Sequence, residues 1–112
     1  MRRLTAALTA ILALLVAAPA VGDTLGVAVK DDVFSPKTRN VAVGDYVRFK
    51  WEGDKPHDVK FTKAPSGASK PSKCSLRSSG KCRRKLKKAG TYKYICTIHL
   101  VSANMRGKIV VD

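Results

Sequence analysis

Short runs in which apolar and polar residues alternate constrain the fold of this chain more than any other feature of its sequence. In the clearest run, Val47, Phe49 and Trp51 fall on one side. The residues between them, Arg48 and Lys50, fall on the other side. Successive side chains of a strand point to opposite faces, so this run predicts a strand with one face in a core and one in solvent.

Further segments repeat this pattern. Core-facing residues are expected at His57, Val59 and Phe61, at Tyr92, Tyr94 and Cys96, and at Ile109 and Val111. Asp58 and Lys60 would then lie on the outer face of their strand. Residues 81–88 are expected to form an outer strand, whose charges discourage edge pairing, and residues 64–72 a loop. Gly, Pro and Asp separate the runs and no sustained helical period follows residue 20, so the pattern predicts an all-β antiparallel sandwich or barrel.

The start of the chain has the layout of an export signal. Met1-Arg2-Arg3 precedes an apolar run over 4–18, which ends at Ala18-Pro19-Ala20. A basic segment, an apolar segment and a small-x-small site in this order predict cleavage after Ala20. An uncleaved anchor is the alternative, but the run is barely long enough to span a bilayer. We therefore expect a signal peptide over 1–20, a single domain over 21–112, and a protein exported to the periplasm, cell envelope or exterior.

The cysteines are odd in number. An exported chain with three cysteines leaves one unpaired when the other two form a disulfide. Cys74 and Cys82 flank a Ser-Ser-Gly segment that can reverse the chain, so a cross-strand disulfide is sterically reasonable, although their spacing alone does not establish it. Cys96 is then the free thiol.

Four side chains after residue 20 form a candidate metal site. His57 begins a predicted strand, Cys96-Thr97-Ile98-His99 ends another, and Met105 follows six residues later. Two imidazoles and a thiolate, with a weak thioether, suit copper in both of its common oxidation states. Zinc fits less well because it favours further thiolates or imidazoles. Cys96 and His99 also lack the partners that a catalytic nucleophile needs.

Charge is strongly asymmetric. The chain has a formal net charge of +14, and residues 59–111 contain 14 basic residues and no acidic one. Such a field favours an acidic protein partner or an anionic surface such as a membrane, although it also serves solubility. The sequence has no feature of specific nucleic-acid recognition. It also has no phosphate-binding glycine loop, no serine elbow and no paired carboxylates, so we do not expect an enzyme.

These features together resemble the cupredoxins, in particular the plastocyanin and pseudoazurin branch. The most specific motif is Gly90-Thr91-Tyr92-Lys93-Tyr94-Ile95-Cys96-Thr97-Ile98-His99; Pro56-His57-Asp58-Val59 and the segment from Met105 to Val111 add to it. The resemblance implies a Greek-key β-sandwich of about eight strands with one type 1 copper ion. It further implies ligation by the imidazoles of His57 and His99 and the thiolate of Cys96, with Met105 as the axial ligand.

Three departures from the family pattern bear on the site. Five residues, Leu100 to Asn104, separate His99 from Met105, one more than is usual in that family, which leaves the axial contact open. Asp58 stands where the family often has asparagine; it can tie the two ligand loops together, but its charge disfavours the reduced site. The family does not require Cys74 and Cys82.

Three functional hypotheses follow. The first is a monomeric carrier that passes single electrons between redox partners, one of them an acidic protein, through the edge of His99 and an apolar patch of Leu100, Val101 and Ala103. The second is a copper storage or delivery protein without redox turnover. The third is a sandwich that binds an acidic partner and no metal.

Overall fold

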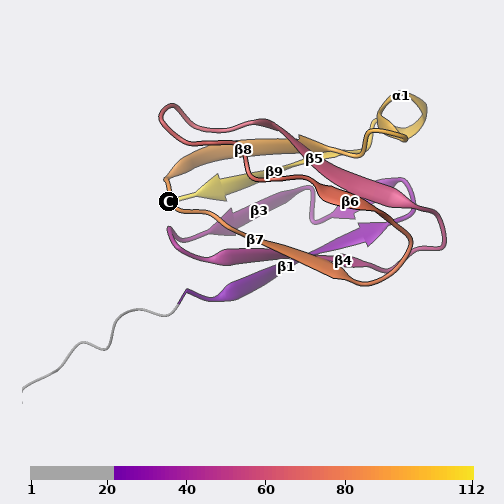
Figure 1. The fold of residues 1–112 in the computed structure, drawn as a ribbon, viewed down its shortest axis with the longest axis horizontal. Coiled ribbons are helices and arrows are strands. Elements are labelled where there is room, and N and C mark those ends of the chain that lie inside the picture. The colour runs from indigo at the N-terminus through magenta and orange to yellow at the C-terminus, as the bar shows by residue number, and fades with distance from the viewer. Residues whose placement is uncertain (1–21) are drawn as a thin grey trace, which may run out of the picture.

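A computed structural model describes residues 22–112, which fold into two β-sheets packed face to face (Figure 1). The predicted signal peptide over 1–20 lies outside the described residues. One sheet has the strand order β2-β1-β4-β7 and the other β3-β9-β8-β5-β6. The elements are β1 (Thr24–Lys30), β2 (Val33–Ser35), β3 (Thr38–Val41), β4 (Tyr46–Trp51), β5 (His57–Lys63), β6 (Cys74–Arg77), β7 (Lys81–Lys85), β8 (Gly90–Ile95), α1 (Leu100–Ala103) and β9 (Arg106–Val111).

The predicted strand faces are confirmed. In β4, Val47, Phe49 and Trp51 are buried, whereas Arg48 and Lys50 are exposed. The expected inward residues of β5, β8 and β9 are buried as well. β7 is an edge strand with no buried residue, as predicted, but it ends at Lys85 and the predicted strand extended to residue 88. No helix of the described part is long and apolar enough to cross a membrane.

Two details of the predicted sandwich are wrong. The described residues form nine strands, where about eight were expected. The sheets are also mixed: β1 pairs with β4 in parallel, and β3 pairs with β9 in parallel. Alternation specifies which face of a strand is buried and carries no information about the direction of its neighbour.

Aromatic side chains fill the space between the sheets. The ring of Tyr94 on β8 packs edge-on against Phe34 of β2 and Phe49 of β4, with ring centroids 4.8 and 5.2 Å away. Gly107 on β9 makes room for this ring, because a Cβ there would lie 2.5 Å from the Tyr94 hydroxyl oxygen. Burial raises the pKa of Tyr94. The end of β8, and with it the position of Cys96, is thereby fixed to both sheets.

Cys74 and Cys82 form a disulfide, with their Cα atoms 6.1 Å apart. The sequence suggested a disulfide across a hairpin. β6 and β7 belong to different sheets, however, so the bond joins the two layers. In the chain-entropy model, closing a loop this short contributes about 2–3 kcal/mol to stability. The disulfide therefore links the sheets and leaves Cys96 as the free cysteine.

One end of the sandwich gathers the ends of strands from both sheets. β1 and β4 finish there, β5 starts there, and the chain from β8 to β9 turns through α1 (Figure 1). The start of the described chain and its C-terminus lie at the opposite end (Figure 1). The end that carries α1 contains the candidate site.

Candidate metal centre

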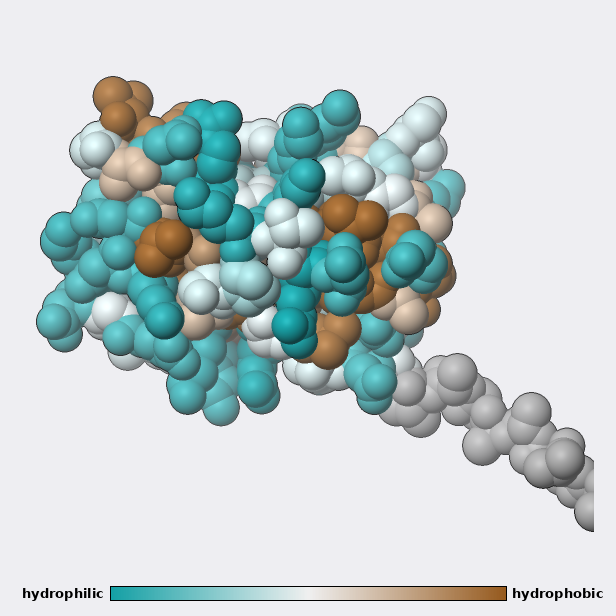
Figure 2. Space-filling view, turned by 180° about the vertical axis from the view of Figure 1, so that it is seen from behind, coloured by the Kyte–Doolittle hydropathy of each residue, from teal (hydrophilic) through white to brown (hydrophobic). Residues whose placement is uncertain are grey.

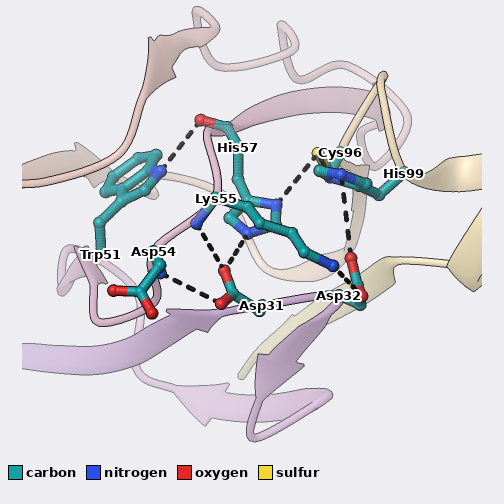
Figure 3. A network of polar contacts seen from close by, with 8 residues as sticks. All are labelled: Asp31, Asp32, Trp51, Asp54, Lys55, His57, Cys96 and His99. Carbon is teal, nitrogen blue, oxygen red and sulfur yellow. Dashed lines mark hydrogen bonds and ion pairs between the residues drawn. The ribbon is translucent and has the colours of Figure 1, made fainter.

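Three of the four predicted ligands converge at the α1 end. One nitrogen from each of His57 and His99 and the sulfur of Cys96 all lie within 4.8 Å of one another. The Cys96 Sγ is 3.8 Å from Nδ1 of His57 and 3.6 Å from Nδ1 of His99 (Figure 3). His57 and Cys96 are fully buried, and the His99 side chain is 17% exposed. The structure thus brings together donor atoms that lie up to 42 positions apart in the chain.

Local hydrogen bonds shape the loop that carries two of these residues. Cys96 follows β8, and its amide donates to the Met105 carbonyl at 3.0 Å. The amides of Ala103 and Met105 both donate to the His99 carbonyl, and Asn104 adopts a left-handed conformation with φ 50°. Asparagine tolerates this conformation better than most residues. The longer loop is therefore closed by its own backbone, and Met105 is buried at its end.

His57 is positioned from the other side of the core. It is the first residue of β5, and its carbonyl accepts a hydrogen bond from the indole Nε1 of Trp51 at 2.9 Å. β5 pairs antiparallel with β8, so the start of one strand lies beside the end of the other. The two histidine rings are tilted by 54°, with centroids 4.6 Å apart. Both rings present Nδ1 to the sulfur.

Asp58 ties the two ligand segments together. Its carboxylate accepts hydrogen bonds from the amide and the hydroxyl of Thr97, at 2.7 and 2.6 Å, and lies 3.1 Å from Nζ of Lys73. Burial alone would raise the pKa of Asp58, but the hydrogen bonds from Thr97 and the ammonium of Lys73 outweigh it and lower that pKa. The link between loops that its position suggested is confirmed.

The outer face predicted for Asp58 suggested a solvent-exposed side chain, and this is wrong, because the side chain is only 1% exposed. The pairing of β5 with β6 shifts register between His57 and Val59. Lys73, just before β6, lies over the carboxylate. Two bonds from Thr97 and the nearby ammonium make it possible to bury this charge.

Sequence reasoning missed Asp31 and Asp32, which lie in the turn between β1 and β2. Asp31 Oδ1 is 3.1 Å from Nε2 of His57, and Asp32 Oδ1 is 3.8 Å from Nε2 of His99 (Figure 3). Hydrogen bonds from the amides of Lys55 and Asp54, and then from His57, lower the pKa of Asp31 to about 2. Consecutive acids in a turn usually indicate solvated residues, so this contact could not be predicted from the sequence pattern.

The donor set fits a copper ion. A free thiol and two imidazole nitrogens are the equatorial donors of blue-copper sites, in which a thioether is a weak, longer ligand. All three donors are already close enough to surround one ion. A closed structural zinc site would be expected to offer four strong donors, and the described residues bring together three such groups.

Comparisons with known proteins agree with this geometry. The family model of copper-binding proteins of the plastocyanin/azurin family matches residues 22–112. A plastocyanin of Prochlorothrix hollandica is 34% identical over 107 residues, which cover 88% of this chain and 81% of the relative. The structure of a pseudoazurin from Sinorhizobium superposes with a TM-score of 0.67 at 27% identity, covering 80% of this chain and 74% of the other.

A third similarity is to amicyanin. A reduced form of an amicyanin variant superposes with a TM-score of 0.67 at 29% identity, covering 80% of this chain and 82% of the other. The fold, the donor set and the sequence match therefore point to one family. This chain belongs to the copper-binding proteins of the plastocyanin/azurin family.

Proposed function

We propose that this protein is an electron carrier that holds one copper ion through His57, Cys96, His99 and Met105 and has no substrate chemistry of its own. The observation that carries the proposal is the arrangement at the α1 end of the sandwich, where the Cys96 sulfur lies 3.8 and 3.6 Å from the Nδ1 atoms of His57 and His99. When bound there, copper supplies a one-electron couple. Export from the cytoplasm belongs to the same proposal and rests on the signal-like segment 1–20.

The chain supplies rigidity and an exit for the electron. The core holds His57 and Cys96, the Trp51 indole donates to the His57 carbonyl, and the Cys96 amide donates to the Met105 carbonyl. The donors therefore need little rearrangement between oxidation states. Of the two imidazoles, that of His99 is the exposed one. The neighbouring Ile98 and Val101 are exposed too, Val101 at 99%. Figure 2 shows a small apolar group at the corner that bears α1, separated by hydrophilic surface from a larger apolar area toward the opposite end.

A role in copper delivery is less well supported. His57 and Cys96 are fully buried, so an accepting protein could not reach either ligand without opening the sandwich. A delivery site needs ligands that a partner can replace one at a time. An electron carrier needs only the exposed edge of one ligand, as His99 provides.

Redox cycling tests the proposed function. The copper-loaded protein should take up one electron per copper from ascorbate and return it to ferricyanide, with full recovery of the spectrum over repeated cycles. Cyclic voltammetry should give one reversible wave. Loss of copper on reduction, or failure to reoxidise, would favour storage or delivery.

The proposed partner is an acidic redox protein, since residues 21–112 alone have a formal net charge of +12, which attracts such a protein over long range. The charge is not concentrated around His99, however. Lys85 of the basic strand β7 pairs with Tyr46, at the end of β4 away from the site. The α1 end carries both signs of charge: the acids Asp31, Asp32, Glu52 and Asp54 are partly or fully exposed there, and so are basic residues such as Lys55, Arg77 and Arg106. We infer that net charge attracts the partner and the apolar contact near α1 fixes its docked orientation.

Replacing Met105 tests the axial position. We expect Met105→Leu to keep copper bound and coloured while raising the reduction potential, because a thioether that stabilises Cu(II) is lost. The ratio of Cu(I) to Cu(II) at a fixed potential should rise by about tenfold, which corresponds to a rise of about 59 mV in the reduction potential for one electron. Spectroelectrochemistry measures the shift. An unchanged potential would show that the longer loop holds the sulfur away from copper.

A further inference from the structure

The distal sides of the two histidine ligands face carboxylates. His57 and His99 turn Nδ1 toward Cys96, which leaves their Nε2 atoms on the opposite side of each ring. Nε2 of the buried His57 contacts Asp31 Oδ1 at 3.1 Å. Nε2 of His99 lies 3.8 Å from Asp32 Oδ1. Figure 3 shows both acids below the rings, on the turn that joins β1 to β2.

Asp31 is held firmly in this position. Its carboxylate accepts hydrogen bonds from the amides of Lys55 at 2.9 Å and Asp54 at 3.1 Å, so it joins the β1–β2 turn to the loop before β5. Gly53 allows the close approach, since a Cβ there would collide with the Asp31 carboxylate. The contact with His57 is therefore supported by three backbone features of the loop before β5: the amides of Lys55 and Asp54 and the absence of a Cβ at Gly53.

Asp32 is held more loosely. Its Oδ2 pairs with Nζ of Lys55 at 3.0 Å, and both side chains are substantially exposed. The ammonium of Lys55 partly offsets the charge that Asp32 presents to His99. Asp32 should consequently act more weakly than Asp31 on the histidine that it faces.

We propose that Asp31, assisted by Asp32, is a positioning residue that sets the orientation, tautomer and electron-donating strength of the histidine ligands and so lowers the reduction potential of the site. This inference rests on the proposed copper-binding function. A carboxylate that accepts the Nε2–H of an imidazole leaves Nδ1 as the free donor and makes it more basic. The negative charge also favours the more positive, oxidised site over the reduced one.

Reduction potentials of matched variants test the inference. Asp31→Asn removes the charge with little change of shape. We expect the ratio of Cu(I) to Cu(II) at a fixed potential to rise by about tenfold, which corresponds to a rise of about 59 mV in the reduction potential. Asp32→Asn should raise it less. Asp54→Asn is the control, because this exposed acid lies in the neighbouring loop before β5 and its side chain has no hydrogen bond or ion pair among the described residues. A shift for Asp31→Asn no larger than that of Asp54→Asn would overturn the inference.

Nitrogen NMR of the Cu(I) protein provides a second readout, which a purely structural role of Asp31 would not change. The Nε2–H of His57 should give a slowly exchanging signal, and Asp31→Ala should lose that protection while the fold persists. A proton found on Nδ1 of wild-type His57 would contradict the inference. If Asp31 variants fail to fold, Asp32→Asn decides alone: a rise above the Asp54→Asn control supports the inference, and no rise overturns it.

The failures of the two proposals can be distinguished. A wild-type protein that does not bind copper, or does not cycle, refutes the proposed function before any variant is made. A wild-type protein that cycles normally, with Asp31→Asn matching the control, leaves the carrier function intact and refutes only the role of the two acids.

Discussion

Cys96→Ser is expected to abolish the blue colour of the copper-loaded protein while leaving the sandwich folded. The thiolate is the only sulfur donor of the three converging groups, and its bond to Cu(II) is what would give the intense absorption. The core around it is formed by aromatic residues from both sheets, which the substitution does not touch. Visible absorption and circular dichroism together measure the outcome.

A double variant, Cys74→Ala with Cys82→Ala, is the matched control. It removes two sulfurs that are bonded to each other and absent from the converging set, so the colour should remain even though stability falls. An unfolded Cys96→Ser protein would assign Cys96 a mainly structural role. A Cys96→Ser protein that stays blue would place the copper elsewhere.

Asp58→Ala should destabilise the metal-free protein by about 3 kcal/mol. Two hydrogen bonds to a charged acceptor are lost, and the amide and hydroxyl of Thr97 are left without that acceptor. The carboxylate is 1% exposed, so water does not replace these bonds easily. Urea unfolding of the metal-free variant measures the loss. Weaker copper retention should accompany it, since Thr97 lies between Cys96 and His99.

Two further variants interpret that result. Asp58→Asn keeps one oxygen for Thr97 and should cost only about 1 kcal/mol. Asp54→Ala removes an exposed acid nearby and should change stability by less than about 0.5 kcal/mol. A loss for Asp58→Ala as small as that of Asp54→Ala would mean that the link between the two ligand loops contributes nothing to the fold.

Strand faces and the three converging donors could be predicted because they depend on local pattern. The alternation of Val47, Phe49 and Trp51 identified a buried face without knowledge of the neighbouring strands, and the face shared by Tyr92, Tyr94 and Cys96 directed the cysteine inward. His57, Cys96 and His99 then stood out as residues suited to one metal.

What sequence reasoning missed depends on contacts between distant segments. The parallel pairing of β1 with β4 and the position of the disulfide between sheets follow from how strands cross from layer to layer, which alternation does not encode. Asp58 is buried because Lys73 and Thr97 compensate its charge. Asp31 lies 26 positions before His57 and only the folded turn brings them together.

Addition of Cu(II) to the metal-free protein, followed by its visible spectrum, tests the central claim most directly. The intensity of a blue thiolate-to-copper band should grow linearly and reach its maximum at one equivalent of copper. The one free thiol of the metal-free protein should then no longer react with a thiol reagent. Stoichiometric uptake without colour would contradict the carrier function and favour a copper-storing protein. No uptake would refute the site formed by His57, Cys96 and His99.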